Sequence, residues 1–334
     1  MGGDILGLKF LRSALVAGVT LACVLPAAAA ELKVVAFAGA SNWPFWIGQE
    51  KGFFKKNGVE TTLDITPNSV EMAKNLYAGR YDMALTAIDN IIAYDEGQGE
   101  AGLPDNAGFV ALFGVDDGML NVMARPGIAS IKDLKGKTFS VDAMTTGFAF
   151  VQRELLKKNG MTDADVNWVK VGGGAQRLEA LVKGEQDATL LNTPLDLAAE
   201  ARGFTRLMRA KDELGGAYQG IVGAVKRETA PAKRAEIVGF IRGFRDSVGW
   251  LVDPANKEEA LAIFQPRMKM ERPAAEKAYA ALTDAKGGIY RDLKINPEGL
   301  KTVMALRSSY AEPRKTLSDA SRYIDDSYLI EASK

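Results

Sequence analysis

The sequence contains no histidine and a single cysteine, Cys23, among its 334 residues. These absences exclude catalysis by a Ser-His or Cys-His pair and a zinc site built from histidine or cysteine ligands. The chain also lacks an excess of either charge, because Lys plus Arg and Asp plus Glu number 42 each. Nucleic acid, which attracts basic surfaces, is therefore not an expected partner.

What is present is the composition of a soluble globular protein. Hydrophobic residues make up 47% of the chain and charged residues 25%. Such values are far from those of a disordered chain, a fibre or a protein with many membrane spans. The length allows about two domains of ordinary size.

The first thirty residues have the pattern of a secretory signal peptide. Lys9 and Arg12 precede an apolar run at 14–26, which four alanines follow. This run is shorter than the roughly 20 residues that a membrane-spanning helix needs. We therefore expect a signal peptide at 1–30 and a periplasmic product. A lipoprotein signal ending at Cys23 is the less favoured alternative, because the residues before the cysteine match such a signal poorly.

Strand-like and helix-like segments alternate through most of the remaining chain. An alternating strand pattern at 59–65, for example, precedes an amphipathic helix pattern at 69–79, and a second series of this kind extends to residue 202. Strands separated by helices of this length predict βαβ units and a mostly parallel sheet. The pattern predicts two α/β lobes, with the chain crossing between them near Asp117 and again near Gly220, and a C-terminal third that is nearly all helical.

Four segments resemble the periplasmic solute-binding proteins of ABC importers. The resemblance is to the group that serves taurine, alkanesulfonates, nitrate and thiamine-pyrimidine precursors, and it extends over essentially the whole chain after the signal. The segments that carry it are NWPFWIGQEKGFFKKNGVE at 42–60, LYAGRYDMALT at 76–86, PGIASIKDLKGKTFSVDAMTTG at 126–147 and LVKGEQDATLLNTP at 181–194.

This resemblance implies a bilobal, type II periplasmic binding protein fold, with two mostly parallel-sheet α/β lobes and a two-strand hinge. Lobe I would comprise 31–118 plus 222–334, and lobe II 119–221. The implied function is capture of a small organic solute, sulfonate-like, taurine-like or aminopyrimidine-like, by a monomer that delivers it to an ABC permease and ATPase complex. The resemblance implies no cofactor, no metal and no catalysis.

Two other functions remain open at this point. One is a ligand-sensing receptor that presents its loaded form to a signalling partner. The other is a carboxylate-based enzyme on the same fold, which would use Asp89 with Asp142.

The candidate ligand-binding residues lie in loops between a strand and the next helix. Open α/β sheets bind ligands beyond the carboxyl ends of their strands, where such loops meet. The candidates are Asn42, Trp43, Thr86, Asp89, Asp116, Thr145, Thr146, Gly147, Asn192 and Thr193.

Local chemistry gives each candidate a ligand-binding and a structural interpretation. Thr145, Thr146 and Gly147 begin a helix, where free N–H groups can donate to a ligand, although a threonine here can also be only a helix cap. Trp43 can wall a flat ligand or pack in the core. Gly172–Gly174 can form an anion-binding turn or only a flexible one.

Acidic residues dominate the predicted cleft. Asp89, Asp116, Asp117 and Asp142 all fall at cleft positions, and none of those loops contains Lys, Arg or His. Because a buried charge needs a partner, the loops favour an amine, an aminopyrimidine or another hydrogen-bond donor as ligand. They predict that nitrate and simple dianions do not bind.

Overall fold

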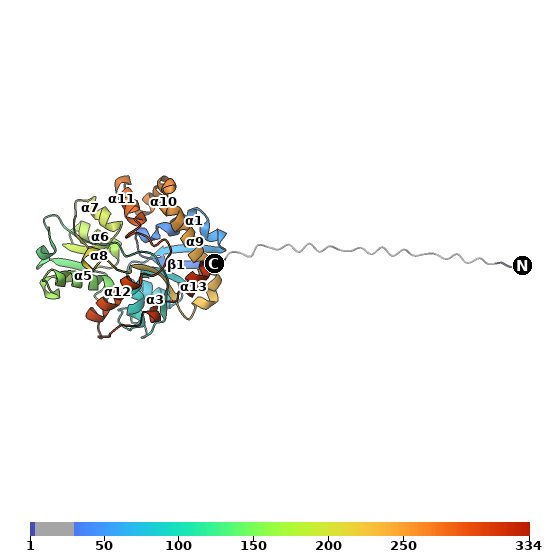
Figure 1. The fold of residues 1–334 in the computed structure, drawn as a ribbon, viewed down its shortest axis with the longest axis horizontal. Coiled ribbons are helices and arrows are strands. Elements are labelled where there is room, and N and C mark those ends of the chain that lie inside the picture. The colour runs from blue at the N-terminus through green and yellow to red at the C-terminus, as the bar shows by residue number, and fades with distance from the viewer. Residues whose placement is uncertain (4–29) are drawn as a thin grey trace.

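The computed structural model describes residues 1–3 and 30–334, and most of them build two α/β lobes that lie side by side (Figure 1). Each lobe has its own five-stranded sheet. The first sheet has the order β2-β1-β3-β10-β4 and the second the order β7-β6-β8-β5-β9. The signal peptide expected at 1–30, with Cys23, lies almost wholly outside the described residues.

The first sheet consists of β1 (Ala30–Ala36), β2 (Val59–Ile65), β3 (Met83–Ala87), β4 (Phe109–Gly114) and β10 (Ile221–Lys226). The second consists of β5 (Leu120–Ala124), β6 (Thr138–Val141), β7 (Asn167–Lys170), β8 (Ala188–Asn192) and β9 (Thr205–Arg209). The helices of the second lobe are α5 (Gly147–Lys158), α6 (Gly174–Lys183), α7 (Leu195–Glu200) and α8 (Ala210–Glu213). The others are α1 (Trp43–Glu50), α2 (Phe53–Lys56), α3 (Ser69–Tyr77), α4 (Ile88–Asp95), α9 (Arg234–Val252), α10 (Lys257–Met268), α11 (Arg272–Thr283), α12 (Pro297–Tyr310) and α13 (Ser327–Ala332).

The sheets are mostly parallel, as the sequence predicts, with one reversed strand in each. β10 runs antiparallel to β3 and β4, and β5 runs antiparallel to β8 and β9. Each reversed strand is the first one after the chain has crossed into its lobe. β3 in the middle of the first sheet and β4 at its edge are both buried along their whole length, which fits a sheet covered by helices on both faces.

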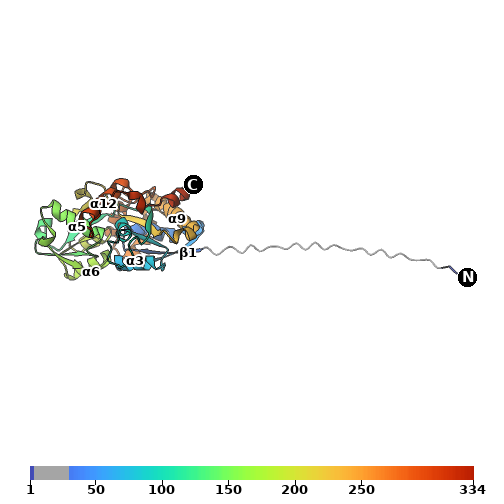
Figure 2. The same ribbon diagram turned by 90° about the horizontal axis from the view of Figure 1, so that it is seen from below.

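The C-terminal third is helical, and it joins both lobes. α9 packs on α1, α2 and α13 of the first lobe. α12 lies beside α5 of the second lobe in both views, and α11 contacts α7 (Figures 1 and 2). In the part of the chain that the structure describes, no helix is both long and apolar enough to cross a membrane.

Trp43 belongs to the core of the first lobe. Its ring is fully buried and stacks on Phe264 with the ring centroids 3.7 Å apart, and its Nε1 donates to the carbonyl of Ala260 at 3.0 Å. Of the two interpretations of Trp43, the structure therefore favours packing in the core over walling the ligand. α1 contacts α10, and its first six residues, 43–48, are all apolar and buried.

The hinge consists of the two backbone segments that cross between the lobes, residues 115–119 and 214–220. Gly118 and Gly220 touch here so closely that a Cβ on Gly220 would overlap the backbone of Gly118. The Gly220 N–H donates to the carbonyl of Asp116 at 3.0 Å. The two segments are thus packed directly on each other, which leaves room for glycine alone at position 220.

The side chain of Asp116 binds the first crossing segment and the residue that directly follows the second. Its Oδ1 accepts from the N–H of Gly118 at 2.8 Å and of Ile221 at 3.3 Å, and its Oδ2 accepts from the hydroxyl of Ser41. Burial raises the pKa of this carboxyl to about 6, although these hydrogen bonds act in the opposite direction. Asp116 is therefore a hinge residue, and its oxygens are occupied by the protein.

The core position of Trp43 predicts a large loss of stability on truncation. Trp43→Ala should lower the free energy of unfolding by about 3–5 kcal/mol, because it leaves a cavity beside Phe264. Urea unfolding measures this loss. Trp168→Ala is the matched control, because Trp168 is half-buried and stacks on Phe139. It should lower the free energy of unfolding by less than Trp43→Ala does. Equal losses for the two variants would contradict the core assignment.

The buried carboxyls predict a pH dependence of stability. Burial raises the pKa of Asp196 to about 6 as well as that of Asp116. Between about pH 4 and 6 the folded protein then binds protons that the unfolded chain has released. The free energy of unfolding should rise as the pH falls from 7 to 5, and Asp116→Asn should reduce this rise. The exposed Asp212→Asn is the control. A wild-type stability that falls over this range would contradict the prediction.

Candidate functional site

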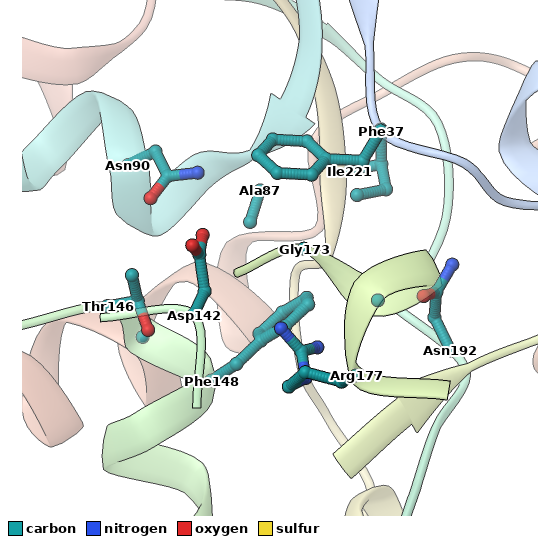
Figure 3. Close-up of a pocket in the computed structure, with 12 residues that line it drawn as sticks. Phe37, Ala87, Asn90, Asp142, Thr146, Phe148, Gly173, Arg177, Asn192 and Ile221 are labelled. Atoms are coloured by element: carbon teal, nitrogen blue, oxygen red, sulfur yellow. The ribbon is translucent and has the colours of Figure 1, made fainter. Parts of the chain in front are cut away.

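A cavity of about 50 Å³ lies between the two lobes, at the carboxyl ends of their strands (Figure 3). Phe37 and Ala87 bound it from the ends of β1 and β3, and Phe148 bounds it from the first turn of α5. Ile221, at the start of β10, completes an apolar wall. The cavity is therefore formed by both lobes together, at the place where the fold class predicts a ligand.

The lobes contact each other directly around the cavity. The Gly173 N–H donates to the carbonyl of Pro67 at 2.8 Å, and the Ala40 N–H donates to the carbonyl of Thr193 at 3.0 Å. The Ser69 N–H donates to Oδ2 of Asp142 at 3.0 Å. Each bond joins one lobe to the other, so the structure shows the lobes closed on each other.

The three glycines at 172–174 permit this close approach. Against the opposite lobe, a Cβ on Gly172 would lie 3.3 Å and one on Gly173 2.8 Å from the carbonyl oxygen of Pro67, whereas one on Gly174 would lie 2.8 Å from Leu195 of the same lobe. The glycines therefore let the start of α6 reach the opposite lobe and the cavity. No side chain of the described residues caps this end of α6.

α5 brings a second helix N-terminus to the cavity. Thr146 caps α5 through its hydroxyl, which accepts from the Ala149 N–H at 3.4 Å, and both Thr146 and Gly147 line the cavity. Gly147 packs against Asp89 of the first lobe so closely that a Cβ would overlap that side chain. Two helix N-termini, each with a partial positive charge, thus face the same space.

Arg177 is the basic residue of the cavity. It is 3% exposed and projects from α6 toward the space (Figure 3). Its Nη1 and Nη2 donate to the carbonyls of Gly172 and Leu190, at 2.5 and 3.0 Å, but its Nε has no hydrogen-bond partner among the described residues. Burial lowers the pKa of Arg177 to about 10, although Asp142 acts in the opposite direction.

Arg177 overturns one argument from the sequence. The loops themselves contain no basic residue, but Arg177 lies two positions beyond the loop at 171–175, as the fourth residue of α6. From there its side chain turns back past Gly172 and Gly174 toward the cavity, where the glycines have no side chains to block it. The expectation that nitrate and simple dianions do not bind therefore loses its basis.

Asp142 is the carboxylate of the cavity. Burial raises its pKa, whereas Arg177 and the hydrogen bonds from Ser69 lower it. Its side chain projects toward Asn90, which also lines the cavity (Figure 3). The cavity thus presents a carboxylate beside an amide on one side and a guanidinium beside a helix N-terminus on another.

Asp89 is paired within the protein. Both of its oxygens accept from Arg307 of α12, at 2.7 Å from Nε and 2.5 Å from Nη2, and both side chains are buried. The sequence predicts that Asp89 binds the ligand, because its own loop offers no cation to pair with it. The cation comes instead from a residue that lies 218 positions further along the chain.

The remaining predicted site residues divide between the cavity and its supports. Asn192 lines the cavity, together with Thr146 and Gly147. The others lie outside its lining: Asn42 donates to the carbonyl of Phe37, Thr86 accepts from Asn90, Thr145 lies against Glu100 and Arg307, and Thr193 accepts from Ala40.

Sequence reasoning missed several lining residues. Asn90 and Phe148 directly follow the candidates Asp89 and Gly147, and Phe37 lies five residues before Asn42, so all three are close in sequence to residues that were predicted. Ile221 carries no polar signal, and only its position after the crossing segment marks it.

Among residues 1–3 and 30–334, no group of three or more acidic, histidine or cysteine side chains is placed to hold a metal.

Known structures share this architecture. The ligand-binding component of an ABC-type import system from Staphylococcus aureus, solved with zinc bound, aligns with a TM-score of 0.72 at 14% identity, over 90% of this chain and 98% of that one. The periplasmic nitrate-binding protein NrtA from Synechocystis PCC 6803 aligns with a TM-score of 0.71 at 14% identity, over 91% and 88%. The alkanesulfonate-binding protein SsuA from Xanthomonas axonopodis pv. citri, bound to MOPS, gives 0.67 at 14% identity, over 82% and 90%.

These likenesses establish the fold, which is that of the periplasmic binding proteins, as the resemblance implied. No curated protein sequence matches the chain. A family model described as NMT1/THI5 like matches residues 40–257, which is more than half of the chain and includes every candidate site residue. The chain therefore belongs to the NMT1/THI5-like family.

Proposed function

We propose that the protein is an exported solute-binding protein that captures a small organic solute between its lobes. The observation that carries this proposal is the cavity, whose walls come from both lobes and meet only when the lobes are in contact. An export signal at 1–30, a periplasmic location, a monomeric state and delivery to an ABC permease and ATPase complex belong to the same proposal.

The size of the cavity supports a small solute. The closed cavity, of about 50 Å³, has room for several groups the size of a water molecule. Its wall combines apolar side chains with a few polar ones, which is the usual composition of a small-molecule site. Affinity then depends on how well these few polar groups match the solute.

The charges of the cavity support an anionic group on the solute. Arg177 has a buried guanidinium whose Nε lacks a partner among the described residues, and α6 begins beside it without a side-chain cap. A sulfonate or carboxylate can accept from both, and charge-assisted bonds of this kind are strong. Asp142 and Asn90 can accept from an amino group on the same molecule. A sulfonate-like or taurine-like solute is therefore our first choice.

An aminopyrimidine-like solute is the second choice. Phe37 and Phe148 both face the cavity and can pack on a flat ring (Figure 3). In this case Asp142 would accept from the exocyclic amine, and Arg177 would donate to a ring nitrogen or a carbonyl group.

Substitution of Arg177 tests the anionic class. A thermal-shift panel of aminosulfonates, alkanesulfonates, carboxylates, aminopyrimidines and nitrate first identifies the solute, and calorimetry measures its affinity. Arg177→Met should weaken an anionic solute roughly 10- to 100-fold, since a hydrogen bond to a charged group contributes about 1.5–3 kcal/mol. Arg177→Lys should lose less, because it keeps the charge.

Lys183→Met is the matched control, because Lys183 is exposed on the same helix. It should bind like the wild type. Unchanged affinity in Arg177→Met would show that the anionic group is absent or bound elsewhere.

Substitution of Asp142 tests the amino group. Asp142→Asn removes the cavity's carboxylate while keeping an oxygen that can accept from the Ser69 N–H. It should weaken solutes that carry an amino group by roughly tenfold or more and leave their amine-free analogues unchanged. Calorimetry on one such pair of solutes measures this difference. Equal effects on both members of the pair would assign Asp142 to lobe contact alone.

Recovery of the solute distinguishes binding from catalysis. A receptor returns its solute chemically unchanged, whereas a carboxylate-based enzyme consumes it. The pairing of Asp89 with Arg307 argues against a role for Asp89 in acid–base catalysis, because both of its oxygens are occupied. NMR of the best binder after long incubation should show the starting solute only, and a new product would favour the enzyme.

A further inference from the structure

Beside the cavity, the first lobe holds one short segment of the second. This segment, residues 143–147, joins β6 to α5 and is called the α5 loop below. Glu100 of the first lobe accepts from the Met144 N–H at 3.0 Å and from the Thr145 hydroxyl at 3.4 Å, both through Oε1. Its Oε2 accepts from Lys170 of the second lobe at 2.7 Å.

Arg307 holds the same loop from another side. Its Nη2 donates to the carbonyl of Thr145 at 2.8 Å and also to Asp89. Its Nη1 donates to Oε1 of Gln98 at 3.1 Å. Arg307 thus joins two residues of the first lobe to the backbone of the α5 loop.

The second lobe also completes the burial of the Asp89–Arg307 pair. Phe150 of α5 lies under the guanidinium, 4.9 Å from ring centroid to Cζ, and Gly147 packs against Asp89. In the closed structure the side chains of Arg307 and Asp89 are 0% and 1% exposed. Moving the second lobe away would remove the Thr145 carbonyl and the Phe150 ring and let water reach the pair.

These groups lie outside the cavity lining. Asp89, Glu100 and Arg307 contact the loop, whereas Thr146 and Gly147 of that loop line the cavity. The three charged residues therefore affect a solute only through the position of the α5 loop and the closure of the lobes.

We propose that Glu100 and the Asp89–Arg307 pair form a latch that stabilises the closed state by holding the α5 loop. A protein whose binding-competent state is partly populated binds its solute with an affinity reduced by that fraction. The latch raises the closed fraction before the solute arrives, and it thereby raises the apparent affinity. The link to affinity rests on the proposed function, but the effect on closure does not.

The distance between α3 and α6 measures closure without any solute. The loops that precede these helices meet at Pro67 and Gly173, across the gap between the lobes. Glu71 and Glu179 are exposed on the two helices. Spin labels attached after Glu71→Cys and Glu179→Cys, in a Cys23→Ser background, report the distance between the two helices by pulsed electron paramagnetic resonance. The wild type should populate a short distance.

Three latch variants should lose part of this short-distance population. Glu100→Gln weakens one half of the latch and leaves the buried pair intact. Arg307→Lys keeps a charge for Asp89 but loses the forked geometry. Asp89→Asn combined with Arg307→Gln removes both buried charges together, which avoids leaving one unpaired. For the identified solute, the apparent affinity should fall roughly 5- to 100-fold in the same order as the closed fraction.

Glu96→Gln is the matched control. Glu96 is also a buried carboxylate of the α4 region, but its partners Lys315, Arg322 and Tyr323 all belong to the first lobe. The distance distribution measured for Glu96→Gln should match that of the wild type. Identical distributions in the wild type and all three latch variants would overturn the proposal.

The two proposals can fail separately. If the distances shift but no solute of the panel binds, the latch stands and the proposed function fails. If a solute binds all variants and the wild type equally, with unchanged distances, the proposed function stands and the latch fails.

Discussion

The direct contact between two crossing segments is the constraint on which the rest of the structure depends. Gly118 and Gly220 touch, and Asp116 accepts hydrogen bonds from the N–H groups of both glycines. This contact sets the lobes with the carboxyl ends of their strands facing each other. Loops that are far apart in the sequence then meet in one cavity, and the same segments are the natural axis for a hinge motion.

Buried charge organises the space between the lobes. One arginine, Arg307, is taken up by Asp89 inside the protein, whereas Arg177 faces the cavity with its Nε unpartnered among the described residues. The first therefore acts between the lobes, and the second is available to a solute. The different roles of the two arginines depend on which acceptors surround each guanidinium. Counting the charges in the sequence does not reveal these roles.

The sequence predicts the fold well and the site only in part. Strands such as β2 follow from local alternation, and the α5 cap at Thr146 follows from residue type. The sequence does not indicate β9, because it is a short, half-exposed edge strand with an arginine near each end. Trp43 carries the same apolar signal whether it walls a ligand or fills a core, so only packing against Phe264 decides its role.

Solution X-ray scattering, without and with a bound solute, tests most directly the claim that the protein is a two-lobed receptor that closes on its solute. The account predicts that a saturating solute lowers the radius of gyration and brings the scattering curve to that of the closed structure. A solute that binds tightly and leaves the scattering of an open molecule unchanged would contradict the claim.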